Sequence, residues 1–199
     1  MRPFTNVTLA LAASGLALGI APTLMRAQRE TTPAAAAAEH APATRRALDD
    51  PTIVAIFDAA NTADIETGKL AADRGRSQEV KTFGAMLARD HQQVRQMGRD
   101  LAAKLHVTPT PPADDAGARA HAAAMKELRA LSGAEFDRAF LKHEVAFHAS
   151  VIDAVKTTLL PAIQNAELKA LVVKVAPAFE AHRAAAAQMA EQLAAKSGR

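Results

Sequence analysis

The chain has 199 residues and a formal net charge of +3, and 49% of its residues are hydrophobic, with no cysteine, tryptophan or tyrosine. The lack of cysteine excludes disulfides, thiolate metal sites and cysteine-linked lipid or haem, so any metal must bind to His, Asp or Glu. The near-balance of charge, with no basic cluster containing interleaved aromatic residues, leads us to reject nucleic acid as a partner.

Residues 1–27 resemble a signal peptide, with an early arginine and an apolar run from Val7 to Met25 that Pro22 interrupts. Ala27 suits the last residue before cleavage, but Met25 is large for such a motif. We favour cleavage and export to the periplasm because the run is interrupted. The alternative is an inner-membrane anchor formed by residues 7–25, since about 20 apolar residues span a bilayer. In that case the N-terminus associates with the membrane.

Residues 28–50 combine an alanine tract with two prolines and no sustained periodicity, which predicts a flexible tether. From residue 51 the apolar spacing is helical, and we predict one domain over 51–196. The first helix is expected over about 52–74, with Asp49 or Asp50 as its N-cap. The "RGRS" turn at 74–77 should return a second helix, about 78–106, antiparallel to it.

Three prolines in "HVTPTPPADDAG" end the second helix, and Asp114 or Asp115 can cap a short helix that reaches about Leu131. Ser132 to Glu135 form a capping-box sequence, which predicts the start of a third long helix that continues to about 158. A fourth helix is expected over about 166–195, with a kink at Pro177. Four long helices and no strand candidate predict an all-α, ferritin-like four-helix bundle with a short extra helix in the second connection.

Several polar residues fall on the apolar faces of these helices. At about 100° per residue, Glu144 lies at the centre of the apolar stripe of the third long helix. Asp137 lies about 20° from that centre and His148 about 40°, whereas His143 lies about 100° away and should face solvent. On the fourth helix, His182 is at mid-stripe.

The first two long helices give weaker signals. Asp90 and His91 each lie about 50° from the stripe centre on opposite sides, and Glu66 lies about 100° away, so it would have to reach in from an edge. Counted from the turn near residue 163, Glu144 and His182 are at similar depth, with His148 one turn closer to that turn. The depth of the second helix relative to the third does not follow from the sequence.

Four stretches carry a family resemblance: "NTADIETGKLAADRG", "VKTFGAMLARDHQQV", "LSGAEFDRAFLKHEVAFHASVI" and "LKALVVKVAPAFEAHRAAAAQMAEQL". Together they resemble the domain of unknown function 4142 family of exported bacterial proteins, over about residues 52–193. The resemblance implies a ferritin-like bundle and no particular activity. It also implies that a set of residues belongs to the family pattern, namely Glu66, Asp90, His91, Phe136, Asp137, His148 and His182.

Two interpretations of the inward polar residues stay open. The first is a metal site in the bundle core, formed by His91, His148 and His182 and completed by Glu66, Glu144 or Asp90; imidazole with carboxylate suits zinc, iron, copper or nickel. The second is a buried hydrogen-bonded network that only fixes helix packing, in a non-enzymatic envelope protein with a structural or interaction role.

The chain contains no Glu-x-x-His sequence, so we do not expect the di-iron centre of ferritin-like oxidases. It also lacks a nucleophile elbow, a phosphate loop and a cofactor fingerprint, and we therefore do not expect an enzyme. The sequence is compatible with a homo-oligomer and identifies no protein partner.

Overall fold

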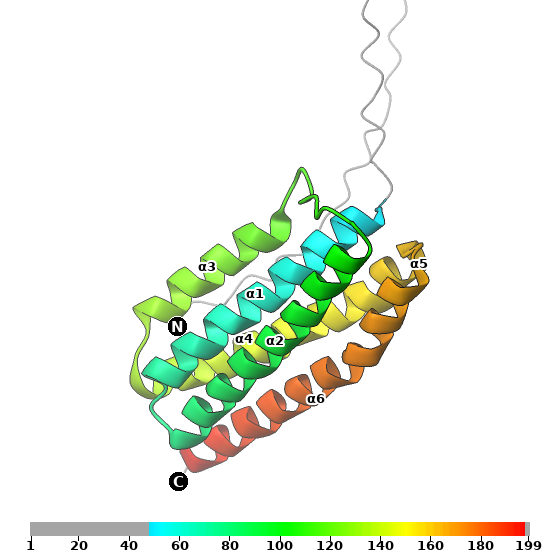
Figure 1. Ribbon diagram of the computed structural model, residues 1–199. Coiled ribbons are helices and arrows are strands. Elements are labelled where there is room, and N and C mark those ends of the chain that lie inside the picture. Colours follow the sequence, from blue (N-terminus) through cyan, green and yellow to red (C-terminus); the bar gives the residue numbers. More distant parts are fainter. Residues whose placement is uncertain (1–47, 198–199) are drawn as a thin grey trace, which may run out of the picture. The chain divides into compact units, whose positions relative to one another are not determined.

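The computed structural model describes residues 48–197, which form a bundle of helices (Figure 1). The long helices are α1 (Asp50–Arg74), α2 (Gln78–Lys104), α4 (Gly133–Ala154) and α6 (Ala166–Ser197). α3 (Ala116–Ala130) lies in the second connection, and a π-helical turn (Val155–Leu159) leads from α4 into the short α5 (Leu160–Ala162). No strand occurs in the described part of the chain, and the predicted all-α bundle is confirmed.

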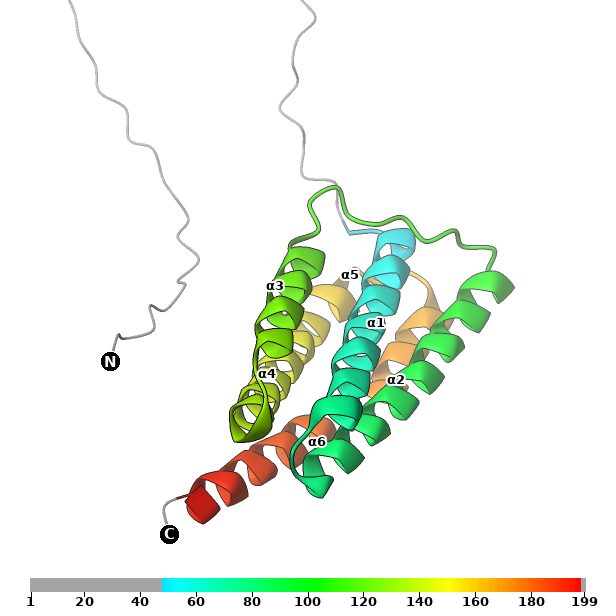
Figure 2. The same cartoon turned by 90° about the vertical axis from the view of Figure 1, so that its left-hand side faces the viewer.

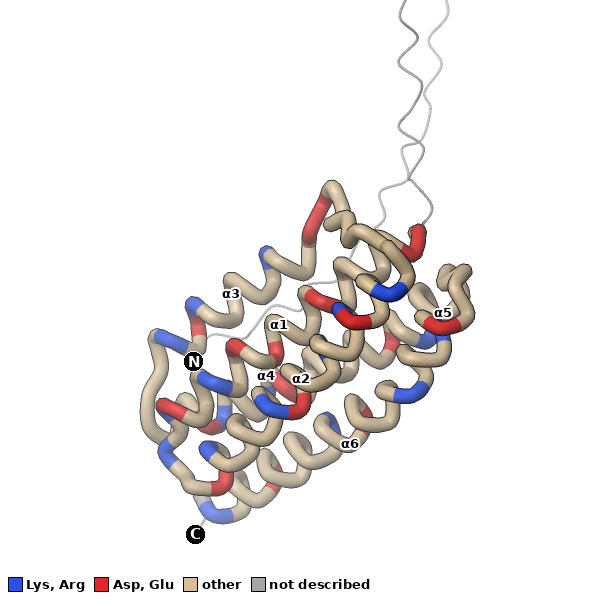
Figure 3. The backbone as a smooth tube through the Cα atoms, in the orientation of Figure 1, with Lys and Arg blue, Asp and Glu red and all other residues tan. Residues whose placement is uncertain are grey.

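The predicted leader, 1–27, and the predicted tether up to residue 47 lie outside the described residues. Within residues 48–197 no helix combines the length and the apolarity needed to cross a lipid bilayer. Charged positions of both signs are scattered along all the long helices of the bundle (Figure 3). α6 contains Pro177 and changes direction along its length in Figure 1.

Side-chain caps account for most of the helix starts. Asp49 accepts a hydrogen bond from the backbone N–H of Thr52 (3.0 Å), and Asp115 caps α3 in the same way. The predicted capping box at the start of α4 is wrong, because the Ser132 side chain makes no capping hydrogen bond. Gly133, the first residue of α4, has a φ of +59°, a left-handed backbone value that does not fit the geometry of a capping box.

The bundle consists of two antiparallel hairpins, α1 with α2 and α4 with α6. α1 and α2 approach closely at Gly68 and Gly84, where a Cβ on either residue would lie 2.6 Å from the carbonyl oxygen of the other. α2 and α6 are also antiparallel, since ion pairs join Glu79 to Lys196 at one end and Lys104 to Glu167 at the other. α3 packs on the outside of α1 and α4 (Figure 2).

Two apolar clusters fill the interior, one toward each end of the bundle. The cluster near the α4–α6 connection includes Phe57, Val94, Val155 and Phe179. The cluster near the α1–α2 turn is formed by other residues of the same helices, including Ala71, Leu87, Leu141 and Ala186, together with residues of α3. On every long helix a short polar segment separates the two clusters. The sequence therefore places one polar layer across the middle of the core.

Asp137 points inward as predicted, but it lies away from that polar layer. Its carboxylate is 2% exposed and accepts hydrogen bonds from the backbone N–H groups of Arg76 (2.8 Å) and Ser77 (2.9 Å) in the α1–α2 turn. Asp137 thus joins the start of α4 to the turn between the first two helices. Its role is structural.

Asp137→Asn should lower the free energy of unfolding by about 2 kcal/mol, because the amide leaves one backbone donor without an acceptor. Chemical denaturation measures the loss, and Asp153→Asn, at an exposed position of α4, is the matched control. An unchanged stability would contradict the structural role assigned to the carboxylate.

Candidate metal centre

Five ionisable side chains, here called the core cluster, meet in the polar layer. α1 contributes Asp64, α2 contributes His91, α4 contributes Glu144 and His148, and α6 contributes His182. None is more than 7% exposed, and Glu144 is fully buried. One ring nitrogen from each histidine lies within 4.8 Å of the others, and His148 forms a second group of that spacing with Asp64 and Glu144.

The tautomer of His91 follows from its outer hydrogen bond. Its Nδ1 lies 2.9 Å from Oδ1 of Asn61, whose Nδ2 donates to the carbonyl oxygen of Phe57 (2.8 Å). Because the Asn61 amide nitrogen is used in that bond, Oδ1 faces the imidazole and must accept. Neutral His91 therefore has its proton on Nδ1. The lone pair of Nε2 points into the core cluster.

His148 is oriented in the same sense by its own helix. Its Nδ1 lies 3.0 Å from the backbone carbonyl oxygen of Glu144, one turn earlier. A carbonyl oxygen only accepts, so Nδ1 must donate and Nε2 keeps its lone pair. This Nε2 lies 4.0 Å from Oδ1 of Asp64 and has no hydrogen-bond partner among the described residues.

His182 connects the core cluster to the surface. Its Nδ1 lies 3.2 Å from Nε2 of His91, and its Nε2 lies 3.5 Å from Oδ2 of Asp90, whose side chain is 36% exposed. With the proton on Nδ1, His182 donates to the lone pair of His91. With the proton on Nε2, it faces the carboxylate of Asp90, and three imidazole lone pairs converge. The second arrangement is favourable only with a cation between the nitrogens.

Among residues 48–197, histidine is the only basic side chain paired with the carboxylates of Asp64 and Glu144. Oδ2 of Asp64 lies 3.5 Å from Nε2 of His91, and Oε2 of Glu144 lies 3.4 Å from Nδ1 of His148. Burial raises the pKa of Asp64 well above its ordinary value, and the negative charge of Glu144 raises it further. In the absence of a cation Asp64 therefore retains its proton to higher pH than an exposed aspartate would.

His91 and His182 resist protonation. Burial, followed by the charges of His148 and His182, lowers the pKa of His91 to about 3. Burial also lowers the pKa of His182. Both are therefore neutral at neutral pH, which is the form of imidazole that binds metal ions.

Four predicted site residues lie in the core cluster, namely His91, Glu144, His148 and His182. The prediction for Glu66 is wrong in its location: its side chain is 49% exposed and pairs with His121 of α3 (2.8 Å). Asp90 lies at the rim and contacts His182 from outside. His143, predicted to face solvent, is half-buried, and burial lowers its pKa.

Asp64 and Asn61 are buried beside the histidines but were not among the predicted site residues. Asp64 follows Phe57 by seven residues, which places it only about 20° from that core residue on the helix. Asn61 follows Phe57 by one turn and lies on the same face. Helical spacing from Phe57 would have identified both as inward-facing. Glu66, the glutamate of the family pattern, lies two residues beyond Asp64 and therefore on another face of α1.

The fold and the core cluster together define an all-α bundle protein with a buried histidine and carboxylate cluster shared by four helices. The family model described as "Domain of unknown function (DUF4142)" matches residues 32–189, and the chain belongs to this family. The family resemblance predicted from the sequence is thereby confirmed. No curated protein and no solved structure matches the chain.

Proposed function

We propose that the core cluster binds one divalent transition-metal ion. The supporting observation is the orientation of the three imidazoles, each of which can direct one lone pair inward while its other nitrogen meets an acceptor outside. Histidines that bind metal ions almost always have such an outer acceptor, which fixes the ring and the tautomer. Asp64 directs Oδ2 toward Nε2 of His91 (3.5 Å) and Oδ1 toward Nε2 of His148 (4.0 Å).

The donor set favours particular ions. Neutral imidazole nitrogens suit zinc, iron, copper and nickel, whereas magnesium and calcium prefer oxygen ligands. Two ionised carboxylates, Asp64 and Glu144, would balance the charge of a divalent ion in this dry environment. Burying a charge without such a balance is costly.

Unpaired polar atoms favour the ion over a network that only fixes packing. With both carboxyl groups ionised, Oδ1 of Asp64, both oxygens of Glu144 and Nε2 of His148 have no hydrogen-bond partner among the described residues. A buried polar group without a partner costs about 1–3 kcal/mol, and more when it is charged. A network that served packing would be expected to satisfy its own members.

The surroundings of the core cluster favour an ion over an organic ligand. Two surface depressions of about 600 and 400 Å³ border α6, one beside α2 and one beside α4. No residue of the core cluster lines either depression. A ligand larger than an ion or a few water molecules would need the helices to separate.

Elemental analysis of protein purified without a histidine tag tests the proposal. Metal-free protein is incubated with Zn²⁺, Cu²⁺ or Fe²⁺ in turn, desalted and analysed. We expect about one ion per chain for at least one metal. A chain that retains none of the three would overturn the proposal and favour the packing network.

Asp64→Asn separates binding from stability. The change keeps the side-chain shape but removes its charge, so Zn²⁺ affinity should fall about 10–100-fold, as for other changes around ligating groups. The raised pKa of Asp64 means that the ionised carboxylate weakens the folded state at high pH. The metal-free variant should therefore be about 1 kcal/mol more stable than the unaltered protein at pH 8, with no gain at pH 4. Loss of stability at pH 8 would contradict this assignment.

A further inference from the structure

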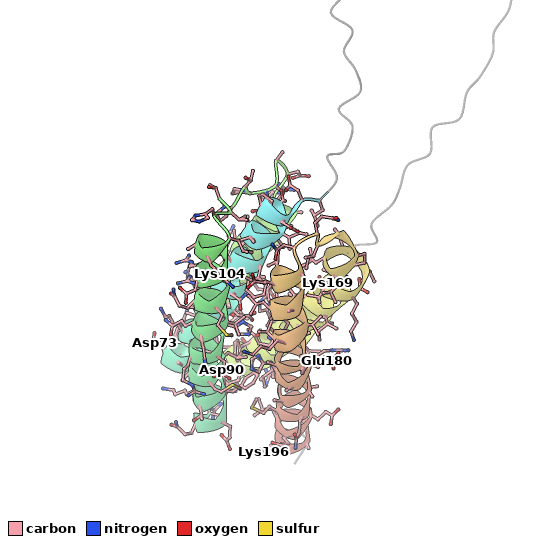
Figure 4. The ribbon with its side chains drawn as sticks, turned by 45° about the vertical axis from the view of Figure 1, so that its right-hand side comes forward. Asp73, Asp90, Lys104, Lys169, Glu180 and Lys196 are labelled. Carbon is pink, nitrogen blue, oxygen red and sulfur yellow. The ribbon has the colours of Figure 1, made fainter. Side chains whose placement is uncertain are left out.

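The core cluster is closest to solvent at His182, on the side where α2 and α6 meet. His182 is 7% exposed, against 1% for His91 and His148 and 0% for Glu144. Asp90 of α2 lies directly outside it, with its side chain 36% exposed. Figure 4 shows Asp90 at about mid-height on α2, with α6 beside it.

The opposite side of the core cluster is closed. α3 lies across α1 and α4 there, and its Met125 and Leu128 are buried against the bundle (Figure 2). His121 of α3 also pairs with Glu66 of α1 (2.8 Å). Among the described residues, no helix covers the junction of α2 and α6 in a similar way. An ion that reaches the core through the α2–α6 junction displaces the least structure.

We propose that the carboxylate of Asp90 and Nε2 of His182 form a loading site at which a divalent cation is first captured before it moves to the core cluster. This inference rests on the proposed metal binding. His182 offers one ring nitrogen to each side, Nε2 to Asp90 and Nδ1 to His91. One imidazole can therefore contact the ion at the surface and then in the core.

The two neutral tautomers of His182 fit the two stages. Before capture, the proton on Nδ1 is donated to Nε2 of His91 (3.2 Å), and the lone pair of Nε2 is directed at the loading site. After the ion reaches the core, Nδ1 binds it and Nε2 regains a proton from solvent, which it donates toward Asp90. The proton released from Nδ1 leaves to solvent, so the imidazole is neutral in both stages.

Arg89 places a positive charge beside the loading site. Its Nε and Nη2 contact Oδ1 of Asp90 at 3.2 and 3.1 Å, while Oδ2 faces His182. The guanidinium reduces the negative potential that an arriving cation meets. Removing the negative charge of Asp90 should therefore slow metal association, and removing the positive charge of Arg89 should accelerate it.

The test is stopped-flow mixing of metal-free full-length protein with Co²⁺, whose visible absorption reports histidine coordination. Asp90→Asn keeps an acceptor for His182 but removes the charge, so we expect the association rate constant to fall about tenfold. The dissociation constant should change less than the association rate constant does, because the amide still accepts a hydrogen bond from His182 and the ligands of the core cluster are intact. Arg89→Gln should accelerate association, and Asp100→Asn, also on α2, should leave it unchanged.

Each result bears on the proposal. Slower association in Asp90→Asn together with faster association in Arg89→Gln supports the loading site. Co²⁺ binding with equal association rates in Asp90→Asn and the unaltered protein overturns the loading site alone, and the metal centre stands. If the unaltered protein binds no Co²⁺, the metal centre and the loading site both fall.

Discussion

His148→Ala is expected to lower the Zn²⁺ affinity of the protein at least about 100-fold, because it removes a ligand whose orientation the α4 backbone already fixes. The effect should appear as a loss of metal-dependent stability. At a Zn²⁺ concentration 1,000 times the dissociation constant, binding stabilises the unaltered protein by about 4.1 kcal/mol. A 100-fold weaker variant at the same concentration gains only about 1.4 kcal/mol.

The measurement is the difference in unfolding free energy with and without Zn²⁺. The loss of stability caused by the cavity that the imidazole leaves is the same in both conditions and therefore cancels. His106→Ala is the control, since His106 is exposed just beyond the end of α2. If Zn²⁺ stabilises His148→Ala as much as it stabilises the control, His148 is not a ligand. If Zn²⁺ stabilises neither, the packing network accounts for the buried histidines.

The residues at the centre of an apolar stripe were the ones that the sequence predicted well. Glu144 and His182 lie at mid-stripe, and helix rotation alone directs both into the core. His148, one turn from Glu144, follows by the same argument. These predictions depend only on positions within one helix, which the sequence determines.

Contacts between residues on different helices were harder to predict. Helix rotation gives an angle, but the level of α2 relative to α4 depends on how the hairpins pack against each other. The structure brings His91 to the level of His148, with ring centroids 5.6 Å apart. Asn61, the outer acceptor of His91, belongs to α1, and its inward position follows from its spacing to Phe57.

Asp137 and Glu144 show why an inward carboxylate does not define a site. Both lie near the stripe centre of α4, and both are buried. Asp137 meets the free backbone N–H groups of the α1–α2 turn, whereas no backbone N–H group among the described residues donates to the oxygens of Glu144, which face other members of the core cluster. The hydrogen-bond partners distinguish a structural carboxylate from a candidate ligand, and those partners come from other helices.

The metal-free protein should lose stability steeply in acid because of its buried histidines. The pKa of His91 falls from about 6.5 in an unfolded chain to about 3 in the fold, so the neutral form is favoured by folding. This contribution is fully present above pH 6.5 and is lost as the pH falls toward 3. It amounts to about 5 kcal/mol over that interval. The lowered pKa of His182 adds to the loss.

Asp64 acts in the opposite direction, since its raised pKa makes the fold relatively more stable as the pH falls through that pKa. The buried histidines outnumber it, so a net loss in acid is expected. His91→Gln retains an amide donor for Asn61. In this variant the unfolding free energy, measured by urea denaturation in the presence of a chelator, should fall less between pH 7 and pH 4 than in the unaltered protein. The exposed-site variant His106→Ala should show the same steep fall as the unaltered protein. Equal slopes in the two variants would show that His91 takes up protons freely in the folded state, which is incompatible with an enclosed core cluster.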